Sequence, residues 1–171
     1  MKIGLFGGFN ACLERYGASL ALEKIKEWGY SYGEALYSKR LFTAEVLRSL
    51  RDALEREEME FPCYSACIDI TLDAALETVR EVADHAAFLG AKLVHHTLVP
   101  SLMEKVDRTR VFALVTERLR YSADYAAKKG LTLLVEPQGF VFNGLEALRE
   151  LFEALKGENV FFMRVKYLAL P

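Results

Sequence analysis

The chain has 171 residues, of which 52% are hydrophobic and 27% are charged. This length can bury one sizeable core, so we expect a single domain over residues 1–171. The 22 Lys and Arg residues are balanced by 24 Asp and Glu residues, and the formal net charge of -2 gives no general field for binding a phosphate backbone. We therefore expect no nucleic-acid partner.

Long apolar segments and paired cysteines are both missing from the sequence. The uncharged stretches 93–103 and 137–145 are shorter than the roughly 18 apolar residues that a membrane-spanning helix needs. The first residues lack the pattern of a signal peptide. Cys12, Cys63 and Cys67 are odd in number, which argues against a disulfide framework and favours a reducing compartment. We expect a cytoplasmic protein with no membrane partner.

Short apolar runs alternate with amphipathic stretches along the chain, which is typical of parallel strands joined by crossover helices. Strands are expected at residues 2–6, 32–36, 61–67, 92–96, 131–135 and 160–165. Helices are expected at residues 19–28, 43–56, 72–89, 107–128 and 145–155, with Thr43 capping the second helix. The predicted fold class is α/β, with about six strands and five helices.

The expected strands begin about every 30 residues, which is the length of one strand and one crossover helix. A closed barrel of eight such units needs roughly 250 residues. The sequence therefore predicts a parallel strand and helix repeat that forms an incomplete barrel. An open doubly wound sheet is the alternative, but Gly4, Gly7 and Gly8 do not match the phosphate-binding loop of a dinucleotide site.

Candidate functional residues follow the expected strands, because reacting groups gather at the carboxyl ends of parallel strands. Those positions hold Phe6, Glu34, Cys67, Asp69, His95, His96 and Glu136. Glu136 is the strongest candidate, since it directly follows the apolar run at residues 131–135. A buried, unpaired carboxylate would cost several kcal/mol, so Glu136 is expected to meet a cation, a donor or solvent. A divalent metal is one such partner, and an Arg or Lys in an ordinary ion pair is another.

The adjacent histidines cannot both face the same side of the sheet, because strand side chains alternate. We favour His96 as a ligand or substrate contact, against the alternative of a packed and hydrogen-bonded core histidine. His85 lies within an expected helix and is interpreted as structural. Cys63 and Cys67 share one strand face, but two thiols make a weak zinc signal. We interpret Cys67 as a small residue that lines a pocket.

Two segments carry a resemblance to a known family. Residues 86–96 read AAFLGAKLVHH and residues 126–137 read AAKKGLTLLVEP. Both are similar to motifs of the xylose-isomerase-like TIM barrels, which include sugar isomerases, sugar 3-epimerases, hydroxypyruvate isomerase and the endonuclease IV group. Residues 145–160 also resemble the family's helix leading into its sixth strand. The resemblance covers nearly the whole chain.

The resemblance implies a role for each candidate. Glu136 lies where the family has a metal-binding glutamate, and His96 or His95 lies where the endonuclease branch has a ligand. The epimerase branch has a pocket residue near Cys67. The implied metal is manganese, magnesium, cobalt or zinc, which would hold substrate oxygens while carboxylates move a proton.

The sequence departs from the family pattern after Asn159 and Val160. The family has an aspartate ligand there, whereas this chain has no carboxylate and carries Arg164 and Lys166. Cations at this position would repel a divalent ion. Strands seven and eight, which carry further family ligands, do not follow. We therefore expect a barrel truncated after the sixth strand, with Glu136 catalytic if the chain is active.

Three functions follow from these expectations. The first is isomerisation or epimerisation of a small sugar or hydroxy-carbonyl substrate, with Glu136 and His96 as metal ligands and with Phe6 and Cys67 as pocket walls. The second is an inactive, truncated relative or oligomeric binding module without a cofactor. The third and least favoured is endonuclease IV-like DNA repair, because three histidines are too few for a three-metal cluster. Exposed edges of the first and sixth strands favour a homodimer or larger assembly.

Overall fold

The computed structural model describes residues 3–98, 107–137, 142 and 144–162, and these form seven strands and five helices. The first half contains β1 (Gly4–Leu5), α1 (Phe9–Glu27), β2 (Tyr32–Gly33), β3 (Ala35–Leu36), α2 (Ala44–Arg56) and β4 (Cys63–Ala66). The second half contains α3 (Ala75–Phe88), β5 (Leu93–Thr97), α4 (Arg108–Lys128), β6 (Thr132–Glu136), α5 (Leu145–Ala154) and β7 (Val160–Phe162).

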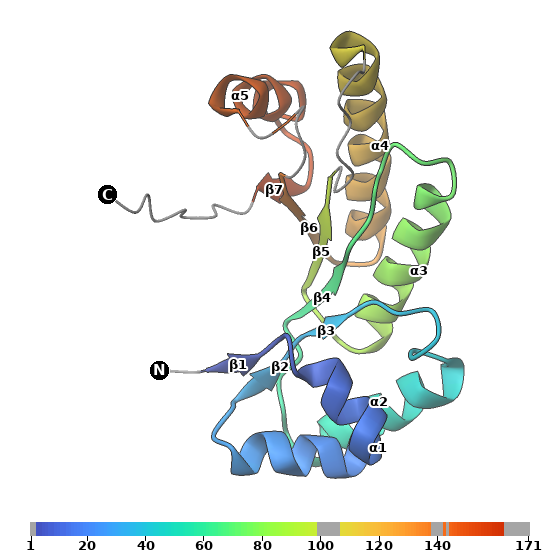
Figure 1. The fold of residues 1–171 in the computed structure, drawn as a ribbon, viewed down its shortest axis with the longest axis vertical. Coiled ribbons are helices and arrows are strands. Elements are labelled where there is room, and N and C mark those ends of the chain that lie inside the picture. Colours follow the sequence, from blue (N-terminus) through green and yellow to red (C-terminus); the bar gives the residue numbers. More distant parts are fainter. Residues whose placement is uncertain (1–2, 99–106, 138–141, 143, 163–171) are drawn as a thin grey trace.

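All the strand pairs are parallel, and every pair joins two strands that are consecutive in the chain. β1 pairs with β2, and β3 to β7 form a five-stranded sheet in sequence order. Figure 1 shows the strands along an arc, with the helices on its outer side. This arrangement confirms the predicted α/β class and the parallel repeat of strand and helix.

The strand register fixes which side chains lie on each face of the sheet. Ser65 of β4 lies opposite His95 of β5, and His95 lies opposite Leu134 of β6. Because side chains alternate along a strand, these residues share the inner, concave face. Tyr64 and His96 belong to the other face, which the helices cover.

Two predicted helix starts agree with the structure because their caps are local signals. Thr43 precedes α2, and its Oγ1 accepts a hydrogen bond from the Val46 backbone N–H at 3.3 Å. Asp107 precedes α4, and its Oδ1 accepts from the backbone N–H groups of Thr109 and Arg110. Both side chains satisfy donors that the first helical turn leaves free.

The first helix is longer than predicted. It begins at Phe9, whereas the sequence pattern predicts a start near residue 19, and it is interrupted at Gly17. Gly17 has a φ of +70°, which an L side chain adopts only with strain. This kink disrupts the hydrophobic periodicity of the first half of the helix, so the pattern alone does not reveal it.

Smaller differences affect the predicted strand at 32–36 and the last strand. The former is divided into β2 and β3 around Glu34, and the latter is described only as Val160–Phe162. The remainder of the predicted last strand, residues 163–165, lies outside the described residues. The division at Glu34 matters for the site, because this side chain meets residues of β4.

The buried side chains fill the layer between the sheet and the helices. Phe9, Ile25, Leu50 and Leu119 have no exposed surface, and Tyr64 joins them from the sheet. No described helix has both the length and the apolar composition that crossing a bilayer requires. The core thus fixes the outer face of the sheet, and the inner face is free of the described helices.

Candidate functional site

A pocket of about 680 Å³ lies on the concave face of the sheet, and we refer to it as the concave pocket. Its size falls in the range of small-molecule sites. Its lining includes Phe6, Glu34, Leu36, Cys63, Ser65, Cys67, Leu93, His95, Thr97, Leu134 and Glu136. Apolar side chains form most of the wall, and a few polar groups converge within it.

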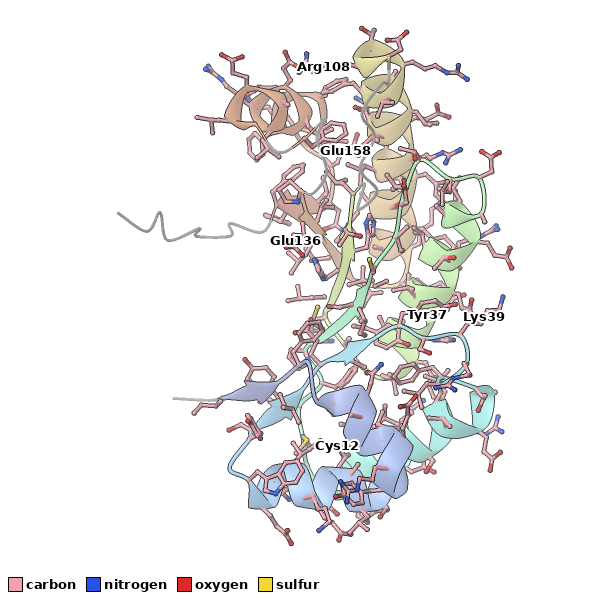
Figure 2. The ribbon with its side chains drawn as sticks, viewed as in Figure 1. Cys12, Tyr37, Lys39, Arg108, Glu136 and Glu158 are labelled. Atoms are coloured by element: carbon pink, nitrogen blue, oxygen red, sulfur yellow. The ribbon has the colours of Figure 1, made fainter. Side chains whose placement is uncertain are left out.

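Glu136 and His95 form the polar centre of the concave pocket. Glu136 is the last residue of β6, and Figure 2 labels it in its place in the fold. Its Oε2 lies 3.7 Å from Nε2 of His95 on the adjacent strand, β5. This separation is too long for a hydrogen bond, so the two groups face each other without bonding.

Ser65 links His95 to a second carboxylate, that of Glu34. The Ser65 hydroxyl donates to Oε1 of Glu34, and Nδ1 of His95 lies 3.1 Å from Ser65 Oγ. Glu34, Ser65, His95 and Glu136 therefore form a continuous polar row across β4, β5 and β6. This row arises because parallel strands in register place alternate residues side by side.

Burial controls the protonation of the groups around this row. Burial lowers the pKa of His95, although the nearby carboxylates of Glu136 and Glu34 oppose this effect. Burial and the charge of Glu34 raise the pKa of Cys63 to about 12. At neutral pH His95 is therefore neutral, and Cys63 is a protonated thiol that is ill suited to metal binding or nucleophilic attack.

The structure places three of the four predicted site residues in the concave pocket. Glu136, Phe6 and Cys67 all line it, and both Phe6 and Cys67 are exposed to solvent there. Whether Glu136 binds a metal or moves a proton stays a prediction. The same holds for contacts of a substrate with Phe6 and Cys67.

The expected orientation of His96 requires correction. His96 is 1% exposed and lies on the helix-covered face, where its Nδ1 donates to the Thr97 carbonyl oxygen at 2.7 Å. His95 lies on the inner face instead. The two histidines face opposite sides of the sheet, as predicted. However, His95 and not His96 faces the pocket, because His95 shares its face with Ser65 and Glu136. We therefore assign the pocket position to His95.

The donor set does not complete a metal site within the described residues. Glu136 and His95 contribute one donor each, and no cluster of three or more His, Cys, Asp or Glu side chains suitable for a metal ion occurs in residues 3–98, 107–137, 142 and 144–162. Divalent ions such as Mg²⁺ and Mn²⁺ take about six ligands, and tetrahedral zinc sites take at least three from protein. The residues present in the described part of the chain do not by themselves fit such an ion.

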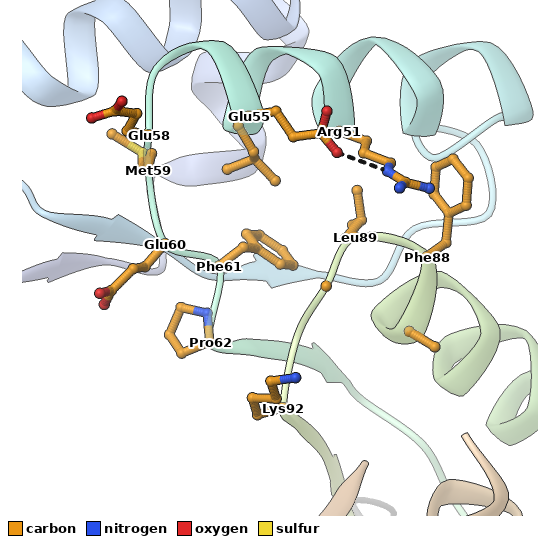
Figure 3. A pocket seen from close by; sticks show the side chains of 13 residues that line it. Arg51, Glu55, Glu58, Met59, Glu60, Phe61, Pro62, Phe88, Leu89 and Lys92 are labelled. Atoms are coloured by element: carbon orange, nitrogen blue, oxygen red, sulfur yellow. Dashed lines mark hydrogen bonds and ion pairs between the residues drawn. The ribbon is translucent and has the colours of Figure 1, made fainter. Parts of the chain in front are cut away.

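A second pocket, of about 590 Å³, opens at the opposite ends of the strands. Figure 3 shows its wall, in which Arg51 pairs with Glu55 at 3.2 Å and lies over the ring of Phe88. Glu58 and Lys92, which line this pocket but not the concave pocket, precede β4 and β5 and place it at the amino ends of the strands. Since function in parallel folds gathers at the carboxyl ends, the concave pocket is the better site.

Sequence reasoning missed Ser65 and its link to Glu34. A signal for Ser65 was present, because it lies between Cys63 and Cys67 on the same face of a predicted strand. The contact with Glu34 joins residues 31 positions apart. No local pattern predicts such a contact, and only the paired strands bring it about.

Comparison with known proteins places these observations in context. A family model described as xylose isomerase-like TIM barrel matches residues 22–163. No curated protein matches the sequence. The family match spans four of the five helices completely, and it includes both Glu34 and Glu136.

Several solved structures share the fold at low sequence identity. A D-allulose 3-epimerase from Methylomonas sp. is 17% identical with a TM-score of 0.72, and the match covers 95% of this chain and 62% of the epimerase. A 3-keto-D-glucoside 4-epimerase from E. coli is 18% identical with a TM-score of 0.74, and the coverage is 95% and 67%.

A third structure, a xylose isomerase-like TIM barrel protein from Mycobacterium smegmatis in complex with magnesium, is 15% identical with a TM-score of 0.66. That match covers 84% of this chain and 54% of the neighbour. The chain thus spans between 54% and 67% of the length of these three structures. At these identities the similarity shows the fold.

Proposed function

Because the chain belongs to the xylose isomerase-like TIM barrel family, we propose that it binds a small sugar or hydroxy-carbonyl compound and takes part in its isomerisation or epimerisation. The observation that carries this proposal is that Glu136, at the carboxyl end of β6, faces His95 of the adjacent strand β5 within the concave pocket. Two of the similar structures are sugar epimerases, which supports the same class of substrate.

The chemistry of the proposal is a proton transfer next to a carbonyl group. The Glu136 carboxylate accepts the proton as the C–H bond breaks, and the electron pair of that bond forms the double bond of an enediolate. The carboxylic acid then returns the proton to the neighbouring carbon on the same face, which isomerises the substrate, whereas epimerisation needs a second proton donor on the opposite face of the enediolate. His95 Nε2 accepts a hydrogen bond from a substrate hydroxyl, and the apolar wall limits the access of water.

A divalent metal, such as manganese, magnesium, cobalt or zinc, belongs to the proposal only as a partner of Glu136. When bound, such an ion polarises a carbonyl group and stabilises the negative charge of an enediolate. Glu136 would be one of its ligands, whereas His96, the second predicted ligand, lies on the helix-covered face of the sheet and does not line the concave pocket. Since the described residues do not complete a site, we derive no step through the metal.

Replacing Glu136 with Gln is the direct test of the proposed proton transfer. We expect the wild-type chain, supplied with Mn²⁺ or Mg²⁺, to exchange a carbon-bound proton of a ketose with D₂O, and we expect Glu136→Gln to slow this exchange at least roughly 100-fold, because the amide cannot accept the proton. Proton NMR of a panel containing D-allulose and hydroxypyruvate measures the exchange.

A matched control separates the base from general effects on charge and folding. Glu153→Gln makes the same change on the exposed surface of α5 and should exchange at the wild-type rate. Absence of exchange by the wild-type chain with every compound would refute the catalytic proposal. Sugar binding without exchange would favour the alternative of a binding module.

Self-association of the chain is the second part of the proposal. Within the described residues, β1 and β7 each pair with one strand, and Ile3, which precedes β1, and Phe161 of β7 are at least half exposed. Open edges and exposed apolar side chains favour contact with a second copy. We expect sedimentation analysis to give a dimer or larger species, and we expect Phe161→Lys to shift the population toward monomer. A wild-type monomer at every micromolar concentration tested would contradict this expectation.

A further inference from the structure

A row of hydrogen-bonding groups behind His95 dictates where this histidine carries its proton. The ionised carboxylate of Glu34 can only accept, so the single O–H of Ser65 is used to donate to it. Ser65 Oγ then offers only lone pairs to His95 Nδ1, which lies 3.1 Å away. Nδ1 must therefore carry the hydrogen of the neutral imidazole.

This proton position leaves Nε2 of His95 as a bare acceptor. Nε2 is buried, and it has no hydrogen-bond partner among the described residues. It faces Glu136 Oε2 at 3.7 Å, and that atom also accepts. An O–H group can direct its one hydrogen in line with only one of these two acceptors, and Nε2 is the one that has no other partner among the described residues.

We infer that Glu34 and Ser65 are positioning residues that hold His95 in the Nδ1–H tautomer, so that His95 Nε2 accepts a hydrogen bond from a hydroxyl of a bound ligand next to Glu136. The tautomer follows from the hydrogen-bond row alone. The identity of the donor as a hydroxyl of a sugar-like ligand rests on the proposed function.

The neighbouring groups are consistent with this tautomer. The Cys63 Sγ atom lies 3.9 Å from Ser65 Oγ, and a protonated thiol there acts as a weak donor to the hydroxyl oxygen. A thiol that donates in this way leaves the Ser65 O–H directed toward Glu34.

Nitrogen-15 NMR of the imidazole rings tests the inference without substrate or activity. The chain has 3 histidines, so the ring signals can be assigned by substitution. We expect wild-type His95 at pH 8 to show a protonated Nδ1 and an unprotonated Nε2. Ser65→Ala removes the acceptor for Nδ1–H, and the ratio of the Nδ1–H to the Nε2–H tautomer should fall roughly tenfold.

Glu34→Gln tests whether Ser65 donates its hydrogen to residue 34, and it changes the side-chain volume very little. The Gln amide can donate to Ser65 Oγ, which frees the Ser65 hydroxyl to donate to Nδ1 and so favours the Nε2–H tautomer. The matched control is Ser122→Ala, which removes a buried serine hydroxyl that donates to the Arg118 carbonyl oxygen and should leave His95 unchanged.

The outcomes separate this inference from the proposed function. An Nε2–H signal in wild-type His95 overturns the inference, whatever the sugar assays give. An unchanged tautomer in both Ser65→Ala and Glu34→Gln also overturns it. If the tautomer is as expected but titration with D-allulose and hydroxypyruvate leaves the Nε2 signal unmoved, the hydroxyl assignment fails while the positioning role stands.

Discussion

Acidification from pH 7 to pH 4 is expected to lower the free energy of unfolding by about 3 kcal/mol through His96 alone. Burial lowers the pKa of this side chain to about 4 in the folded protein, whereas an unfolded histidine has a pKa of about 6.5. Each unit of difference is worth about 1.36 kcal/mol. The environment explains the size of the effect, because charging the ring would place an ion between the sheet and the helices.

The sign of this effect follows from proton uptake. Between the two pKa values the unfolded chain binds a proton at this position and the folded chain does not, so stability rises with pH in that interval. The contribution is complete above about pH 6.5 and is lost progressively as the pH falls to about 4. Burial lowers the pKa values of His85 and His95 as well, and these groups act in the same direction.

Urea unfolding at a series of pH values measures the effect. His96→Asn retains an amide donor for the Thr97 carbonyl oxygen but cannot take up a proton, so the slope of stability against pH should be clearly smaller than in the wild type. His85→Asn is the matched control, since this half-buried histidine should contribute less to the slope. An identical slope in the wild type and His96→Asn would show that His96 is not the responsible group.

Local signals account for the parts of the fold that could be predicted from sequence. Thr43 and Asp107 mark helix starts with short side chains that cap the backbone, and these signals act within three residues. Apolar runs such as β6 predict buried strands because this signal, too, lies within a few consecutive residues. α1 was predicted only in part because Gly17 interrupts its periodicity, and its first half is positioned by packing of Phe9 into the core.

The candidate site was only partly predictable, because its geometry depends on strand pairing. The position of Glu136 follows from its place after an apolar run. The choice between His95 and His96 depends on the register of β5 against β4 and β6, which no local pattern provides. The contact of Ser65 with Glu34 likewise forms only when β3 pairs with β4.

Replacing Tyr64 with Ala is expected to destabilise the fold by about 3–5 kcal/mol, the range for loss of a large buried aromatic side chain. Tyr64 has no exposed surface and lies on the helix-covered face of β4. Its ring packs edge-on against Phe42 at 5.3 Å and lies 6.2 Å from Phe61 and 5.9 Å from His85. Removing it leaves a cavity that these rings cannot readily fill.

Two further substitutions divide the effect into its parts. Tyr64→Phe removes only the hydroxyl, whose oxygen lies 3.4 Å from His85 Nδ1, and should cost about 1 kcal/mol or less because this hydrogen bond is long. Tyr121→Ala removes a partly exposed tyrosine of α4 and serves as the surface control. Urea unfolding curves measure all three changes, and a loss below 1 kcal/mol for Tyr64→Ala would contradict the role of Tyr64 in the core.

Substitutions of Tyr64 also test a link between the core and the concave pocket, because Tyr64 and Ser65 are successive residues of β4 that point to opposite faces. Tyr64→Leu keeps much of the apolar volume and should fold where Tyr64→Ala is marginal. If packing of Tyr64 fixes β4, then the Nδ1–H tautomer of His95 should be less populated in Tyr64→Leu than in Tyr64→Phe. Equal populations in the two variants would show that pairing with β3 and β5 alone positions Ser65.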